Sequence, residues 1–170
     1  MSPTVRVPPL LLVVWVLHFA VFPQLRVFDV MANVMLLVAI VSGVVAGPER
    51  GATMGFVAGI LADLSIQSTP FGLSALTFCL VGWWVGSLQT RVLHATWWIP
   101  VVTAAAATAA GMLLYSVLGY VVGEDQLVSM RLVPIVGVTA LWSAMLSPLF
   151  IRAFRWALVT EHTRLGLVAR

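Results

Sequence analysis

Charged residues are scarce in this chain of 170 residues, and lysine is absent altogether. Only 9% of the residues are charged and 61% are hydrophobic, whereas soluble domains carry about 25% charged residues. This composition excludes an ordinary soluble domain and predicts a membrane protein. The nine basic residues are all arginines, scattered singly at the ends of apolar runs. That pattern is typical of anchoring at a lipid surface, and we expect no nucleic-acid binding.

Residues that commonly carry chemistry are also few. The single cysteine, Cys79, leaves no intramolecular disulfide framework and no paired-cysteine metal spacing. The three histidines, His18, His94 and His162, are far apart and lack metal-ligand spacing. Neither a phosphate-binding loop, a nucleotide fingerprint nor a serine–histidine–aspartate pattern is present. We therefore expect no catalytic, metal or cofactor site, and no enzyme.

Charged residues divide the chain into long apolar stretches. A helix needs about 20 mostly apolar residues to cross a membrane, and the stretch 51–62 approaches this only if Asp63 is included. The expected fold class is all-α, a compact bundle of six transmembrane helices forming a single integral-membrane domain over residues 1–170. The expected spans are residues 8–25, 30–47, 51–66, 70–88, 96–122 and 133–151. No small-x-small cleavage site follows the first apolar run, so we expect a span there rather than a signal peptide.

The arginines predict the orientation of this bundle. With a cytoplasmic N-terminus, seven arginines lie inside and two outside, in agreement with the positive-inside rule. The predicted inside residues are Arg6, Arg50, Arg91, Arg152, Arg155, Arg164 and Arg170, and the outside ones are Arg26 and Arg131. Both termini are therefore expected in the cytoplasm.

Prolines mark further local features. The segment "GPER", residues 47–50, is expected to be a tight connection between two helices. Pro100 and Pro148 fall within apolar runs and are expected to bend their helices.

Glycines recur at four-residue steps within the span 51–66 and in its neighbours. Small residues at this spacing let helix backbones approach closely in lipid. A competing interpretation is that membrane helices are rich in glycine in general, but several helices here share the spacing, including Ala39, Gly43 and Gly47. The predicted helix-packing residues are Gly51, Gly55, Gly59, Gly82 and Gly86.

Asp63 is the one acid inside an apolar run, and two roles are open to it. An intramembrane carboxylate often belongs to a proton or ion relay. Alternatively, it accepts hydrogen bonds from the turn "STPFG" and from the free N–H groups that begin the next helix. No second buried acid or base stands ready to pass a proton onward, which favours the structural role. The predicted polar cap comprises Asp63, Ser68, Thr69, Pro70 and Gly72, with Pro70 at the first helical position.

Three segments between residues 47 and 86 carry a resemblance to a known family. They read "GPERGATMGFVAGILADL", "TPFGLSAL" and "VGWWVG", and they resemble the rod shape-determining protein MreD family. The family pattern is G-F-x-x-G-x-x-x-D-L, then P-x-G-x-x-A-L, then V-G-x-x-x-G. The matching positions are Gly55, Phe56, Gly59, Asp63, Leu64, Pro70, Gly72, Ala75, Leu76, Val81, Gly82 and Gly86.

This resemblance implies a non-catalytic scaffold in the bacterial plasma membrane that helps regulate cell shape and lateral peptidoglycan synthesis. Its implied partners are membrane lipid and the single-span protein MreC, and through MreC the actin-like cytoskeleton and the peptidoglycan synthases. The resemblance implies no cofactor.

A substrate-binding subunit of an energy-coupling-factor vitamin importer is the alternative, since such subunits are six-helix membrane proteins of similar size. They typically carry an Ala-x-x-x-Ala face on the first helix. Here the first apolar run contains only Ala20, so the scaffold is the favoured interpretation.

Overall fold

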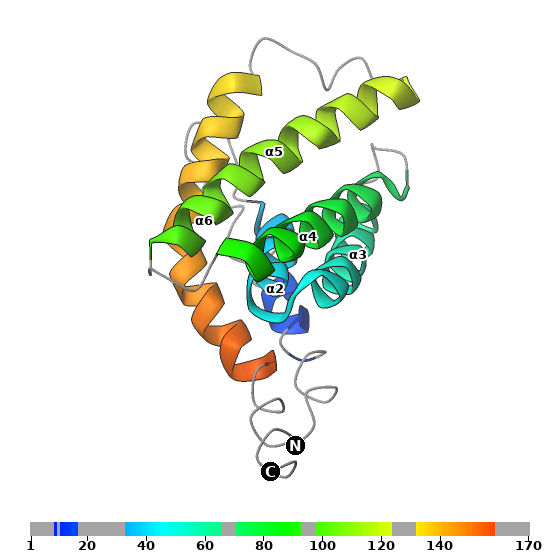
Figure 1. The fold of residues 1–170 in the computed structure, drawn as a ribbon. Helices are drawn as coiled ribbons and strands as arrows, with labels where there is room; N and C mark the ends of the chain where they lie inside the picture. Colours follow the sequence, from blue (N-terminus) through cyan, green and yellow to red (C-terminus); the bar gives the residue numbers. More distant parts are fainter. Residues whose placement is uncertain are drawn as a thin grey trace, which may run out of the picture.

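The computed structural model describes residue 9 and residues 11–16, 33–65, 71–92, 98–123 and 132–158. All regular secondary structure in these ranges is helical, which confirms the predicted all-α class. Residues 11–16 form a short helical segment. The longer helices are α2 (Val34–Ala46), α3 (Pro48–Asp63), α4 (Leu73–Val92), α5 (Ile99–Val122) and α6 (Leu132–Leu158) (Figure 1).

Helix α2 is the centre of the molecule. Every residue from Val34 to Val44 is buried, and all but Ser42 and Gly43 are hydrophobic. A helix that is apolar on all sides belongs in a protein core or in a membrane, and here α3, α4, α5 and α6 all contact α2. Asn33 starts the helix, because its side-chain oxygen accepts a hydrogen bond from the Leu36 N–H at 3.1 Å.

Helices α3 and α4 lie side by side and run in opposite directions (Figure 1). The start of α3 at Pro48 meets the last turns of α4 at Gly86, and its end near Gly59 meets the first turn of α4 at Ala75. Helices α5 and α6 form a second contacting pair that covers other sides of α2.

The connection between α2 and α3 is shorter than predicted. Only Gly47 separates the two helices, so the tight connection expected within residues 47–50 is a single residue, and α3 begins at Pro48 rather than at residue 51. Gly47 has φ +87°, a conformation that favours glycine. Pro48 then begins α3, because its fixed φ suits the first helical turn and its missing N–H would have no partner there.

The prediction that Pro100 bends its helix is wrong. Pro100 lies in the first turn of α5 rather than inside it, so it does not interrupt the helix. Helix α6 extends beyond the span expected at residues 133–151 and continues to Leu158. Arg152 and Arg155 end the apolar run without ending the helix, since arginine is a good helix former and a cation in the last turn interacts favourably with the helix dipole.

Pro148 lies inside α6, as expected. Its missing N–H would otherwise donate to the carbonyl of residue 144, four positions earlier. The Ser147 hydroxyl donates to the Ala144 carbonyl at 3.0 Å instead. A buried side chain therefore supplies the hydrogen bond that the proline removes.

Two described helices are long and apolar enough to cross a membrane, by length and composition alone: α5 and residues Ile135–Ala157 of α6. Helix α2 and the segment Leu73–Leu88 of α4 are apolar but shorter. The predicted first span lies largely outside the described residues. The six-span arrangement therefore stays a prediction.

Candidate functional site

The Asp63 carboxylate joins the end of α3 to the start of α4. Both of its oxygens accept backbone hydrogen bonds: Oδ2 from the N–H groups of Gly72 at 2.9 Å and Ala75 at 3.2 Å, and Oδ1 from that of Ser74 at 3.2 Å. The side chain is only 5% exposed. The first N–H groups of a helix have no partner within the helix, so an acid from another helix satisfies them here. Its negative charge also lies at the end of α4 where the helix dipole favours an anion.

Gly72 lets the chain turn into this contact. Its φ of +101° is strained for residues with a side chain, and its N–H donates to Asp63 while its carbonyl accepts from the Leu76 N–H at 2.9 Å. Helix α4 begins at Leu73 rather than at the expected residue 70. Ser68, Thr69 and Pro70 lie outside the described residues. The sequence predicts donors to Asp63 both from this turn, including Ser68 and Thr69, and from the first N–H groups of the next helix. The described donors are all backbone N–H groups.

The glycine ladder of α3 lies directly against the backbone of α4. A Cβ atom placed on Gly59 would lie 2.6 Å from the Ala75 nitrogen, and one on Gly55 would lie 2.7 Å from the Phe78 carbonyl carbon. Real Cβ atoms essentially never approach so closely. Any side chain at these positions would force the two helices apart.

The same packing continues to the other end of the pair. A Cβ on Gly82 would lie 2.7 Å from the carbonyl carbon of Gly51, and one on Gly86 would lie 2.5 Å from the Pro48 nitrogen. The structure thus brings together all five predicted packing glycines along one α3–α4 contact.

Helix α2 also takes part in this contact, through Gly43, which was not among the predicted packing glycines. A Cβ on Gly43 of α2 would lie 2.5 Å from the Gly82 carbonyl oxygen, and one on Gly51 would lie 2.7 Å from the Gly43 Cα. The four-residue spacing of Ala39, Gly43 and Gly47 was the available signal. A Cβ placed on Gly47 would meet nothing within 4 Å, although the Gly47 carbonyl carbon lies 2.6 Å from a Cβ placed on Gly86.

Six other buried hydroxyl groups are satisfied within their own helices. Each of these hydroxyl groups donates to a carbonyl three or four residues earlier. The residues are Ser42, Thr77, Thr108, Ser116, Thr139 and Ser147. Within the described residues, no group of three histidine, cysteine, aspartate or glutamate side chains could hold a metal ion. The described contacts of the site hold α2, α3 and α4 against one another.

No family model, curated protein or solved structure matches this chain. The resemblance noted in the sequence therefore stands on its residues alone. Among those residues, Gly55, Gly59, Gly82 and Gly86 make close backbone contacts between helices. Asp63 accepts three hydrogen bonds, two of them from Gly72 and Ala75.

Proposed function

We propose that this chain is a multi-pass protein of the bacterial plasma membrane, with six membrane-spanning helices and both termini in the cytoplasm. Large apolar side chains on the outer faces of α5 and α6 support the proposal: Val102, Leu113, Val117, Leu141, Met145 and Leu149 are each more than half exposed. In water such continuous apolar surface is rare on a monomer. In lipid it is the expected exterior.

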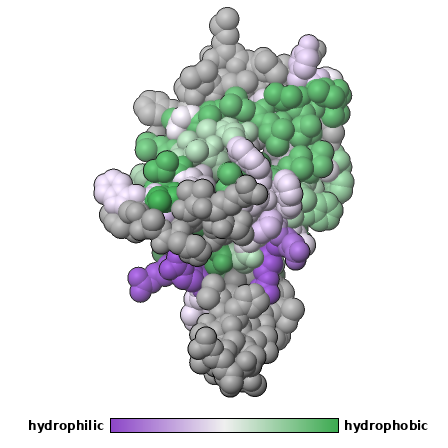
Figure 2. All heavy atoms as spheres, viewed as in Figure 1, coloured by the Kyte–Doolittle hydropathy of each residue, from purple (hydrophilic) through white to green (hydrophobic). Residues whose placement is uncertain are grey.

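The distribution of charge supports the same proposal. On the face shown in Figure 2, hydrophobic residues cover much of the helical region, and strongly hydrophilic residues gather toward its lower end. The charged residues described with their side chains are Glu49, Arg50, Asp63, Arg152 and Arg155. Asp63 is the buried exception, and its charge is satisfied by three N–H groups. Charge at the ends of apolar helices is typical of membrane proteins.

Within that membrane setting, we propose that the protein is a non-catalytic scaffold of the cell-elongation machinery, in the manner of the MreD family. The observation that carries the proposal is the junction of α3 and α4. There, glycines shared with the family make backbone-to-backbone contacts, and Asp63 accepts hydrogen bonds from the start of α4. A scaffold needs a surface of constant shape. Helices in contact through glycine, with a satisfied carboxylate at one end, have little freedom to slide or separate.

The proposed partner is a single-span protein of the MreC kind, which would connect this chain to the actin-like cytoskeleton and to the peptidoglycan synthases. A rigid helical unit can hold such a partner in one orientation, because its outer faces keep their positions while the partner binds.

Deletion of the gene in its source bacterium tests this function. We expect wider or rounder cells and a loss of labelled peptidoglycan precursor along the lateral wall, both restored by the wild-type gene on a plasmid. A Gly59→Leu gene should not restore them, while a Gly137→Ala gene should, since Gly137 has nothing within 4 Å of a Cβ position. Normal width and labelling after deletion, together with loss of vitamin uptake, would instead identify the importer subunit.

A further inference from the structure

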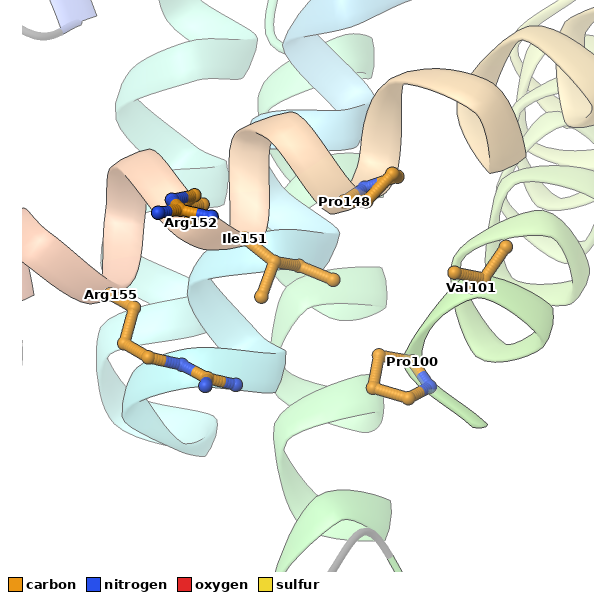
Figure 3. A pocket seen from close by; sticks show the side chains of 6 residues that line it. All are labelled: Pro100, Val101, Pro148, Ile151, Arg152 and Arg155. Carbon is orange, nitrogen blue, oxygen red and sulfur yellow. The ribbon is translucent and has the colours of Figure 1, made fainter. Parts of the chain in front are cut away.

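An open pocket of about 480 Å³ lies between the beginning of α5 and the second half of α6. Pro100 and Val101 line it from α5, and Pro148, Ile151, Arg152 and Arg155 line it from α6 (Figure 3). Its volume falls within the roughly 300–1,000 Å³ of small-molecule sites. Four of its six lining residues are apolar and the other two are arginines.

The two arginines share the pocket because they are three residues apart on one helix, a spacing that places side chains on the same face. Figure 3 shows the Arg155 side chain extending toward the space between Ile151 and Pro100. Both arginines are exposed, so their guanidinium groups are accessible from outside the protein.

No carboxylate among the described residues neutralises this pair of charges. The described acids are Glu49 and Asp63, and Asp63 is buried at the start of α4 with its oxygens occupied. Glu49 lies on α3, in the first turn, and does not line the pocket. The pocket therefore combines apolar walls with two positive charges that have no described counter-ion.

We propose that this pocket binds an anionic phospholipid, with the phosphate on Arg152 and Arg155 and the beginning of an acyl chain against Ile151, Val101 and the two prolines. Guanidinium groups recognise phosphate oxygens through paired hydrogen bonds. Basic pockets between membrane helices on the cytoplasmic side are suited to anionic headgroups. The proposal rests on the membrane embedding proposed above, and not on the role in cell elongation.

A simpler role for the arginines is to anchor the end of α6 at the membrane surface. Any arginine at that level would serve this purpose equally, because the attraction to an anionic surface depends on charge and not on a particular pocket. Arg50 provides the comparison, since it lies in the first turn of α3 and does not line the pocket.

The test is equilibrium binding of short-chain lipid to the purified full-length protein in an uncharged detergent. Dihexanoyl phosphatidylglycerol is titrated below its micellar concentration, with dihexanoyl phosphatidylcholine and inorganic phosphate as parallel ligands. We expect saturable binding of phosphatidylglycerol that is weakened about tenfold or more in Arg152→Gln/Arg155→Gln. Arg50→Gln should bind as the wild type does. All variants should stay folded and melt close to the wild-type temperature, because these side chains lie outside the core.

Several results would overturn the proposal. Equal binding of phosphatidylcholine would show that the negative headgroup is not recognised, and equal binding of inorganic phosphate would show a site for a free anion. An equal loss in Arg50→Gln would show surface charge alone. A deletion strain of normal shape would refute the elongation role while leaving this binding result intact, whereas a chain recovered in the soluble fraction would refute the membrane embedding on which both depend.

Discussion

At the scale of single residues, the Asp63 carboxylate accepts three specific hydrogen bonds. Two carboxylate oxygens accept from three N–H groups, those of Gly72, Ser74 and Ala75. Asparagine retains one acceptor oxygen, but its NH₂ group must then face at least one N–H donor. Alanine removes both acceptors.

We therefore predict a graded loss of stability. Asp63→Ala should lower the free energy of unfolding by about 3 kcal/mol, because buried N–H groups lose their partners. Asp63→Asn should cost roughly half as much, since two of the three bonds can persist on its single oxygen. Thermal unfolding of both purified variants in detergent measures the order.

Cell width at matched protein levels separates the structural role from a relay. If the role of Asp63 is structural, Asp63→Asn should support nearly normal cell shape at permissive temperature. Complete loss of function in a stably folded Asp63→Asn protein would point to the charge itself, as in a proton or ion relay.

The glycines offer a second residue-scale prediction with internal controls. A methyl group on Gly51 would meet the backbones of Gly43 and Gly82, neither of which can rotate away. The nearest atoms to one on Gly111 would be the ends of the Leu36 and Val81 side chains, at 3.2 Å. One on Gly137 would meet nothing within 4 Å.

Alanine at these positions should therefore give three different results. We expect Gly51→Ala to destabilise by about 3 kcal/mol through overpacking, Gly111→Ala to cost about 1 kcal/mol or less, and Gly137→Ala to stabilise by about 0.5–1 kcal/mol through helix propensity. Melting temperatures in one detergent would show the order. Similar values for Gly51→Ala and Gly137→Ala would contradict the described contact.

At the scale of the helix, Ser147 and Pro148 form a coupled pair in α6. The hydroxyl of Ser147 donates to the Ala144 carbonyl that proline leaves without its helical donor. The serine is fully buried, so water does not replace it in the folded protein.

A double-mutant cycle tests this coupling. Ser147→Ala should cost about 1 kcal/mol when Pro148 is present, the magnitude of a hydrogen bond between groups inside a membrane protein. In a Pro148→Ala background the backbone N–H of residue 148 is restored, and the same change should cost almost nothing. Thermal unfolding of the four proteins gives the coupling energy. Equal costs in the two backgrounds would show that the hydroxyl acts independently of the proline.

At the scale of the whole molecule, the proposed topology makes one direct prediction. Reporter fusions after residue 68 and after residue 170 should lie on opposite sides of the membrane, with the C-terminus cytoplasmic. The reason is the preference of arginine-rich ends for the cytoplasm. A phosphatase fusion, active outside, and a fluorescent-protein fusion, active inside, would report the two sides. The same side for both positions would exclude the six-span arrangement.

Much of the architecture was predictable because it depends on local pattern. Low charge and long apolar stretches predict helices, and all described elements are helices. Boundaries were less predictable, because charge ends an apolar run without ending a helix, as at Arg152 and Arg155. A proline ends or begins a helix according to its neighbours, and Gly47 before Pro48 moved the start of α3 three residues earlier than expected.

The sequence by itself determined which residues had to be unusual: a carboxylate within an apolar run, and glycines at four-residue steps on three helices. Composition and spacing along one chain are sufficient for this, because they limit what each helix can bury. Only the tertiary structure decided the pairings. Gly43 meets Gly51 and Gly82, Asp63 meets three N–H groups up to twelve residues away, and Arg152 and Arg155 share a pocket with the start of α5. Such contacts join separate helices, and their geometry follows from how all the helices pack around α2.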